Sequence, residues 1–239
     1  MAEIICLIGT KGGSGKTTLS HMLCYGLGLL GRNAACVMTD ICRQPPPHGA
    51  LPYVFADGRT EQARAKIISA LRARNDWIGV IDGGANRMET DSALYAESDL
   101  VLLPFRDSQE DLRVVCSDLA RLPRAYALPS QWPTNPWQYK ASLRLLESIP
   151  EEFRGRILAP VFSISSSKLL LQTQPAGEFP TPLNNTCRAV ARYLLGVLEN
   201  GASALPAAQT AIGASVRIQR VLATREAETY KQMDQARRP

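Results

Sequence analysis

The chain has 239 residues, a length that suits one α/β domain better than two very small ones, and its 45% hydrophobic and 21% charged residues are ordinary for a soluble protein. Its apolar runs fall short of the ~20 residues that a membrane-spanning helix needs, which excludes that class. The formal net charge of +5 favours anionic partners only weakly, because a nucleotide site by itself needs lysines.

The N-terminus passes directly into an apolar run, without the cationic segment and cleavage site of a secretory signal. The six cysteines form no C-x-x-C pair, and we interpret them as reduced, buried thiols. We therefore expect a cytoplasmic protein.

Apolar runs alternate with helical patterns along most of the chain. Short strands are expected at residues 4–8, 34–38, 77–81, 100–103 and 157–162. Helices are expected at residues 19–30, 61–74, 91–98, 108–121, 140–148 and 184–198. Because this alternation is typical of parallel strands joined by right-handed crossovers, we predict a three-layer α/β/α domain with a mostly parallel central sheet.

Three stretches depart from the alternation. Prolines in residues 45–52 predict an irregular loop, and the proline-rich residues 123–136 indicate a surface excursion or a small insertion. Residues 215–236 predict a C-terminal helix with mixed charges. We assign residues 1–200 to the main domain and residues 201–239 to a helical extension packed on it.

A glycine-rich loop follows the first strand and leads into the first helix. In this context backbone N–H groups cradle phosphate oxygens, and the helix N-terminus adds its positive dipole end. We expect Lys16 to reach the β- and γ-phosphates of a nucleotide and the Thr17 hydroxyl to ligate Mg²⁺. Thr10 replaces the first glycine of G-x-x-x-x-G-K-[ST], and the sequence fits K-G-G-x-G-K-[ST] instead. The residues of the loop are Lys11, Gly12, Gly13, Ser14, Gly15, Lys16, Thr17 and Thr18.

Two aspartates end the strands that follow. Asp40 comes after the second strand, and Asp82 ends the apolar strand that begins at Trp77. An apolar strand ending in Asp is the Walker B pattern, which places a carboxylate at the carboxyl edge of the sheet, beside the phosphates and Mg²⁺. Since Mg²⁺ keeps most of its waters, we expect Asp82 to act mainly through a water.

Together, residues 11–18, Asp40 and the run Val80-Ile81-Asp82-Gly83 resemble the ParA/MinD group of deviant-Walker P-loop ATPases, and most of all its short ParA-like partition proteins. Residues 98–104 are also similar to the family's strand after Walker B. The resemblance covers about the first half of the chain and extends beyond it only in layout.

This resemblance implies ATP or ADP and Mg²⁺ as ligands, and a homodimer in the ATP state. In the family the lysine at the position of Lys11 crosses the dimer interface and contacts the nucleotide of the other subunit. Asp40 would orient the attacking water, while Lys11 and Lys16 offset charge in the transition state. These three residues are our catalytic candidates, and Thr17 and Asp82 our metal candidates.

The sequence departs from the family around Asp40. The family run Asp-x-Asp-Pro-Gln is replaced by Met38-Thr39-Asp40-Ile41-Cys42, so the first Asp and the Pro-Gln are absent. We expect nucleotide binding to be retained and leave open whether hydrolysis is slow. The alternative for Asp40 is a carboxylate that only caps its loop.

The family suggests two surfaces that the ATP dimer could bind. ParA-like members bind DNA non-specifically through basic C-terminal helices, and MinD-like members bind membrane through an amphipathic C-terminal helix. The apolar residues near the C-terminus form no long stripe here, so we favour DNA. The candidate DNA-binding residues are Arg188, Arg192, Arg217 and Arg220, with a merely solvated helix face as the alternative.

Our first functional hypothesis is a nucleoid-associated bacterial or plasmid-encoded ATPase that positions a plasmid, a chromosome region or a protein assembly, with hydrolysis stimulated by a ParB-like or other adaptor protein. Alternatives are a weakly hydrolysing ATP-gated recruitment module, a MinD-like membrane-associated ATPase, and a metabolic synthetase of related fold. The loop from Trp132 to Trp137 fits a partner surface and packing over the sheet edge equally well.

Overall fold

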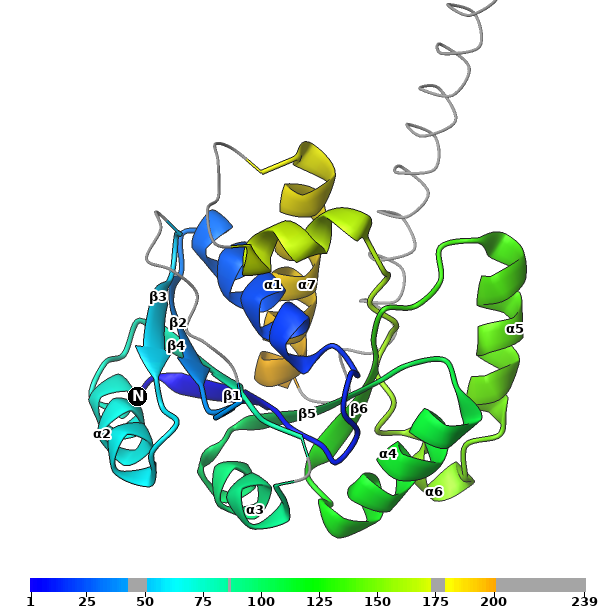
Figure 1. Ribbon diagram of the computed structural model, residues 1–239, viewed down its shortest axis with the longest axis horizontal. Coiled ribbons are helices and arrows are strands. Elements are labelled where there is room, and N and C mark those ends of the chain that lie inside the picture. Colours follow the sequence, from blue (N-terminus) through cyan, green and yellow to red (C-terminus); the bar gives the residue numbers. More distant parts are fainter. Residues whose placement is uncertain (43–50, 86, 173–178, 201–239) are drawn as a thin grey trace, which may run out of the picture.

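A computed structural model describes residues 1–42, 51–85, 87–172 and 179–200 (Figure 1). Within this part of the chain the core is a six-stranded, wholly parallel sheet with the strand order β3-β2-β4-β1-β5-β6. The strands are β1 (Glu3–Leu7), β2 (Asn33–Met38), β3 (Val54–Asp57), β4 (Trp77–Asp82), β5 (Leu100–Phe105) and β6 (Ala125–Pro129). The prediction of a parallel central sheet is confirmed.

Helices cover both faces of this sheet, which gives the predicted three layers (Figure 1). The helices α1 and α7 and the 3₁₀ helix η1 pack on one face, and α2, α3 and α4 pack on the other. The helical elements are α1 (Lys16–Leu29), α2 (Glu61–Arg72), α3 (Met88–Glu97), α4 (Gln109–Arg121), α5 (Pro136–Glu147), α6 (Glu151–Arg154), η1 (Ser165–Leu171) and α7 (Thr181–Asn200).

The central strand β1 shows why the strands are continuous apolar runs in the sequence. Ile4, Ile5, Cys6 and Leu7 are all 0% exposed, because side chains on both sides of the strand are covered by helices. The Asp99 carboxylate accepts a hydrogen bond from the Ile4 amide at 2.7 Å and pairs with Arg72 at 2.6 Å. This contact fixes the beginning of β1 against α2 and β5.

Two strands lie where none was predicted. The edge strand β3 is short and directly follows the proline-containing loop, and β6 lies inside the stretch interpreted as an insertion. Pro123 and Pro129 flank β6, but neither interrupts its ladder, since the strand begins after the first and ends at the second.

The expected strand at residues 157–162 is wrong as a regular strand. This segment runs beside β6, where the Leu158 amide donates to Ala127 O and the Val161 amide donates to Pro129 O, each at 2.8 Å. Only isolated bridges result, because Pro160 has no N–H to continue the ladder. The segment nevertheless covers the outer side of β6.

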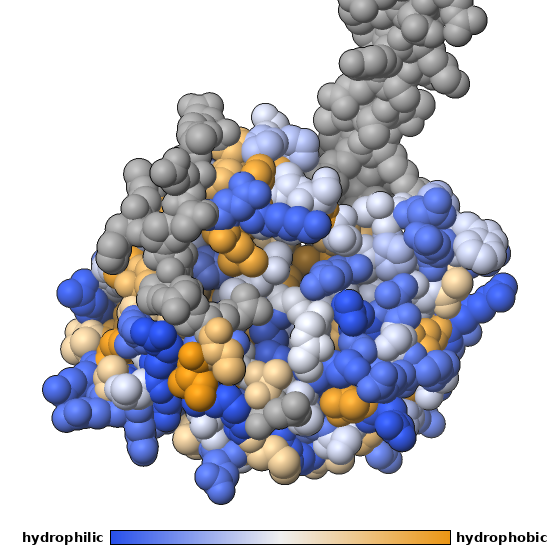
Figure 2. Space-filling model, viewed as in Figure 1, coloured by the Kyte–Doolittle hydropathy of each residue, from blue (hydrophilic) through white to orange (hydrophobic). Residues whose placement is uncertain are grey.

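The surface of the face in Figure 2 is mainly hydrophilic, with apolar colour in separate small areas. Trp132 is 0% exposed and packs edge-on against Phe105, whereas Trp137 is 79% exposed at the start of α5. The tryptophan loop was expected to be either a partner surface or packed over the sheet edge, and Trp132 is packed. None of the described helices is long and apolar enough to cross a membrane. The proposed extension lies outside the described residues.

Candidate functional site

The parallel sheet brings the three predicted motifs to one edge. In the register of the sheet Leu7 at the end of β1 pairs with Asp82 at the end of β4, and Asp82 pairs with Met38 at the end of β2. The glycine loop follows β1, and Asp40 follows β2 after one intervening residue. The loop and both aspartates therefore lie together at the carboxyl edge of the sheet.

The glycine loop adopts a conformation that needs its glycines. Gly9, Gly13 and Gly15 have φ values of 130°, 74° and 91°, in the region that side chains disfavour. Gly15 is the N-cap of α1, so the helix begins at Lys16. The loop lines a cavity of about 190 Å³ together with Asp40, Gly83, Ala85 and Gln131. Such a cradle at a helix N-terminus fits an anionic phosphate group.

Lys16 is only 7% exposed, and its ammonium turns back into the loop. It donates to the carbonyl oxygen of Gly9 at 3.1 Å and to that of Lys11 at 2.8 Å. Burial lowers the pKa of Lys16, and the charges of Asp91 and Asp82 act in the opposite direction. The loop thus wraps around one buried cation, which is the charge that a phosphate would require.

Sequence reasoning missed two buried aspartates beneath the loop. Asp118 on α4 accepts hydrogen bonds from the Thr10 amide at 2.9 Å and the Thr10 hydroxyl at 2.7 Å. Asp91 on α3 is 1% exposed, and burial raises its pKa to about 6 against the opposing effects of the Gly9 amide and the Lys16 charge. The beginning of the loop is therefore held by Asp118 of α4, and Asp91 of α3 adds a second buried acidic group near Lys16.

Asp82 is 1% exposed at the end of β4. The Ser20 hydroxyl, one turn of α1 beyond Lys16, lies 3.4 Å from Asp82 Oδ1, and Thr17 is half-buried at the cavity. A hydroxyl and a carboxylate oxygen are the hard ligands that suit Mg²⁺. Among the described residues no group of three or more His, Cys, Asp or Glu could hold a metal ion.

Asp40 is half-buried on the rim of the cavity. Its Oδ1 accepts a hydrogen bond from the Cys42 amide at 3.0 Å, so the loop-capping alternative describes part of what the side chain does. The guanidinium of Arg87 donates to the carbonyl of the preceding residue, Thr39. Arg87 thereby connects the loop after Asp82 to the turn that carries Asp40, a contact that the sequence did not suggest.

Lys11 turns away from the cavity, towards the N-terminal end of α4. Its ammonium lies 2.7 Å from Glu110 Oε1 and 3.8 Å from Asp111 Oδ1, and its side chain is 26% exposed. Within one chain, Lys11 therefore forms an ion pair at the surface, whereas Lys16 is buried.

The DNA-binding candidates are only partly described. Arg192 is exposed and Arg188 half-buried on α7, one helical turn apart. Arg217 and Arg220 lie outside the described residues. The two described arginines face the same side of α7, as their i, i+4 spacing requires.

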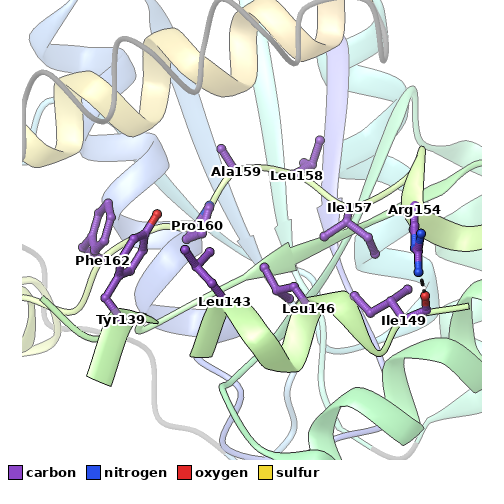
Figure 3. A pocket seen from close by; sticks show the side chains of 10 residues that line it. All are labelled: Tyr139, Leu143, Leu146, Ile149, Arg154, Ile157, Leu158, Ala159, Pro160 and Phe162. Atoms are coloured by element: carbon purple, nitrogen blue, oxygen red, sulfur yellow. Dashed lines mark hydrogen bonds between the residues drawn. The ribbon is translucent and has the colours of Figure 1, made fainter. Parts of the chain in front are cut away.

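A second cavity of about 370 Å³ lies between α5 and residues 157–162 (Figure 3). Figure 3 shows Leu143 and Leu146 on α5 facing Ile157 and Pro160 across it, with Arg154 at one end. Arg154 donates to the carbonyl oxygen of Ile149 at 3.2 Å. This lining is mostly apolar and carries no motif residue, so we do not assign it to the phosphate site.

The parallel sheet, the glycine loop at the end of β1 and the flanking helices define the fold of a P-loop NTPase. Comparison with solved structures specifies this further as the ParA/MinD-type fold, as the sequence resemblance implied. Neither a known protein family nor a curated protein matches the chain in sequence.

Three solved structures illustrate the likeness. A protein described as a plasmid partition protein of Borrelia burgdorferi, bound to AMPPNP, has 10% identity and a TM-score of 0.57 over 82% of this chain and 99% of that one. The MinC:MinD cell division complex of Aquifex aeolicus has 15% identity and a TM-score of 0.60 over 82% and 96%. Cobyrinic acid a,c-diamide synthase of Mycobacterium smegmatis, with an ATP analogue and magnesium, has 16% identity and a TM-score of 0.54 over 84% and 97%.

Proposed function

We propose that this protein binds ATP with Mg²⁺ and hydrolyses it as a ParA/MinD-like switch. The observation that carries this proposal is the position of the glycine loop, which shares one sheet edge with Asp40 and Asp82 and encloses the buried Lys16. Solved structures of the same fold hold AMPPNP, or an ATP analogue with magnesium, which supports the choice of ligand.

In this proposal each residue of the loop has a defined task. Backbone N–H groups of Gly12 to Thr18 bind phosphate oxygens, and the Lys16 ammonium exchanges its two carbonyl contacts for the β- and γ-phosphates. Thr17 and Asp82 hold Mg²⁺, the latter through a water. The metal supplies positive charge that offsets the phosphate charge.

Through Lys11, dimerisation with a second copy of the chain would depend on which nucleotide is bound. We propose that Lys11 leaves Glu110 and contacts the nucleotide held by the partner subunit, as its position at the front of the loop suggests. ATP then stabilises a homodimer more than ADP does, because the γ-phosphate adds charge that a second lysine offsets.

We propose that Asp40 orients the attacking water, a role supported by its place in the lining of the loop cavity after β2. Its bond to the Cys42 amide ties it to the turn that replaces the family's Pro-Gln. We therefore propose slow intrinsic hydrolysis that an adaptor protein stimulates. A solved relative crystallised with its partner, the MinC:MinD complex, supports a partner-dependent mode of action.

We further propose that the ATP dimer binds DNA without sequence preference and positions a cargo. The exposed Arg192 and its neighbour Arg188 supply the described part of this surface, and Arg217 and Arg220 supply the rest. The fold suits a MinD-like membrane-associated ATPase equally well. DNA is favoured because the C-terminal sequence is basic and its apolar residues form no long stripe along a helix.

The deciding experiment is light scattering or analytical sedimentation without nucleotide, with ADP and with ATP. We expect a dimer with ATP alone, which Lys11→Ala abolishes and Lys66→Ala, an exposed lysine on α2, leaves intact. A monomer under all three conditions would contradict the switch.

ATP turnover measured with and without DNA separates the remaining alternatives. Turnover that DNA or an adaptor increases supports the positioning ATPase, whereas ATP-dependent dimerisation without turnover identifies the recruitment module. DNA binding must also fall steeply between low and moderate salt, because phosphate contacts release counterions. A DNA affinity that does not change with salt concentration would contradict the proposed basic surface.

A further inference from the structure

Gln131 has an unusual backbone conformation. Its φ is 52°, and within the described residues it is the one non-glycine residue with positive φ. A side chain in the left-handed region carries a steric cost, and such residues concentrate at functional sites where the surroundings hold them in place. The conformation of Gln131 therefore needs a reason.

The residues on either side of Gln131 are fixed and buried. Ser130 and Trp132 are both 0% exposed. The Ser130 amide donates to Phe105 O at 2.8 Å, its hydroxyl donates to Ser14 O at 2.5 Å, and the Trp132 amide donates to Val161 O at 3.0 Å. Gln131 alone is exposed between these anchors, so the chain presents one side chain outward at the end of β6.

The side chain of Gln131 lies over the phosphate loop. Its Nε2 is 2.7 Å from the position that a Cβ on Gly15 would take, so it contacts the residue that immediately precedes Lys16. Gln131 lines the loop cavity of about 190 Å³ and also an adjacent open groove of about 630 Å³ that continues towards Trp137. Gln131 thus belongs to the lining of both spaces.

The sheet order defines which end of a bound nucleotide Gln131 faces. In the order β2-β4-β1-β5-β6, Asp40 and Gly83 follow strands on one side of β1, and Gln131 follows β6 on the other. If the γ-phosphate lies on the side of Asp40, the nucleoside lies on the side of Gln131. The groove beyond Gln131 has the volume of an ordinary small-ligand site.

We propose that Gln131 is a nucleotide-binding residue whose side-chain amide bonds the ribose and α-phosphate end of the nucleotide. This inference rests on the proposed function of the loop. The amide carries two donors and one acceptor, which suit both a phosphate oxygen and a ribose hydroxyl. The left-handed backbone is retained because it directs this amide over Gly15.

Gln131→Gly separates binding from folding. Glycine accepts a φ of 52° without strain, so the melting temperature of the variant should equal or exceed that of the unchanged protein. Affinity for AMPPNP and ADP should fall about fivefold, the effect of one lost hydrogen bond. A variant that melts lower and binds nucleotide normally would show that Gln131 serves only the turn.

Gln131→Glu tests the position of the amide. The substitution keeps the shape but places a carboxylate beside the α-phosphate, so nucleotide affinity should fall further than in Gln131→Gly, most strongly at low salt. The control, Gln62→Glu, makes the same change at an exposed position on α2 and should leave affinity unchanged.

Inorganic tripolyphosphate identifies the end of the nucleotide that Gln131 contacts. Its affinity should fall less in Gln131→Gly than the affinity for AMPPNP does, because tripolyphosphate offers phosphate oxygens but no ribose hydroxyl. Equal loss for both ligands overturns the assignment to the nucleoside end. If the unchanged protein binds neither ligand, the proposed function fails, a result distinct from failure of this inference alone.

Discussion

The ammonium of Lys11 lies 2.7 Å from Oε1 of Glu110, so the lysine that distinguishes this phosphate loop is paired within its own chain. The pair lowers the pKa of Glu110, and Glu110 is 66% exposed. An exposed pair of this kind is weak and screened by salt. It would therefore compete only weakly with the proposed contact of Lys11 with a partner subunit.

Removal of the Glu110 carboxylate should favour the ATP dimer. Glu110→Gln removes the shorter of the two ion pairs of Lys11 and leaves the one with Asp111, so we expect the dimer dissociation constant with ATP to fall about twofold to threefold, with a smaller effect at high salt. Sedimentation at several protein concentrations measures this constant. Glu151→Gln on α6 removes the same charge elsewhere on the exposed surface and should have no effect. Weaker dimerisation of Glu110→Gln would show that Glu110 itself belongs to the interface.

Arg87 should matter for hydrolysis more than for binding. Its guanidinium holds the Thr39 carbonyl beside Asp40, so Arg87→Gln lets that turn shift while the proposed phosphate-binding loop stays intact. We expect turnover to fall about tenfold, since small displacements of catalytic groups are costly, and ATP affinity to change little.

Steady-state turnover together with AMPPNP titration separates these two effects. Arg113→Gln, an exposed arginine on α4, provides a control of the same chemistry. A large loss of AMPPNP affinity in Arg87→Gln would place Arg87 in the binding site instead.

The buried Asp91 should make stability depend on pH. Burial raises its pKa from 3.8 to about 6, so the folded protein binds the proton more tightly than the unfolded chain does. Asp91 thus costs no stability below about pH 4, and its cost grows as the pH rises towards 6 and is fully present above it.

Asp91→Asn should therefore be more stable than the unchanged protein at pH 7.5, by about 3 kcal/mol, with the difference vanishing near pH 4. Urea unfolding at a series of pH values measures this difference. Glu97→Gln, exposed on the same helix, should show no such pH dependence. A gain that is constant with pH would mean that the pKa of Asp91 is the same in the folded protein and in the unfolded chain.

Much of the site was predictable because its parts follow strands. Buried parallel strands are short apolar runs, and their carboxyl ends meet at one edge, so residues 11–18, Asp40 and Asp82 could be placed together from local patterns. The strand β6 was missed because its flanking prolines resemble a loop. Local sequence patterns are therefore sufficient to place a site residue when its motif directly follows a strand.

The supporting contacts of the site could not be predicted in this way. Thr10 and Asp118 are 108 residues apart in the sequence, and Gln131 reaches Gly15 only because β6 is separated from β1 by the single strand β5. The conformation of Gln131 also has no sequence signal, since glutamine is not a typical left-handed residue. Such contacts depend on tertiary packing.

Gly26 allows the two helices α1 and α7 to approach each other closely. A Cβ on Gly26 would lie 2.0 Å from the carbonyl oxygen of Cys187 and 2.9 Å from the Ala191 Cβ. In an open helix Ala is favoured over Gly by about 1 kcal/mol. Here the collision is with backbone, which cannot rotate away, so the packing term outweighs the helix propensity.

We therefore expect Gly26→Ala to lower the free energy of unfolding by about 3 kcal/mol, as an overpacked core does. Gly196→Ala on α7 provides the matched control, because nothing lies within 4 Å of its added Cβ, and it should raise stability by about 0.5 kcal/mol or more. Urea unfolding of both variants measures the contrast. If both substitutions stabilise the protein, α1 and α7 do not meet backbone to backbone at Gly26, and the covering of this sheet face must differ from that described.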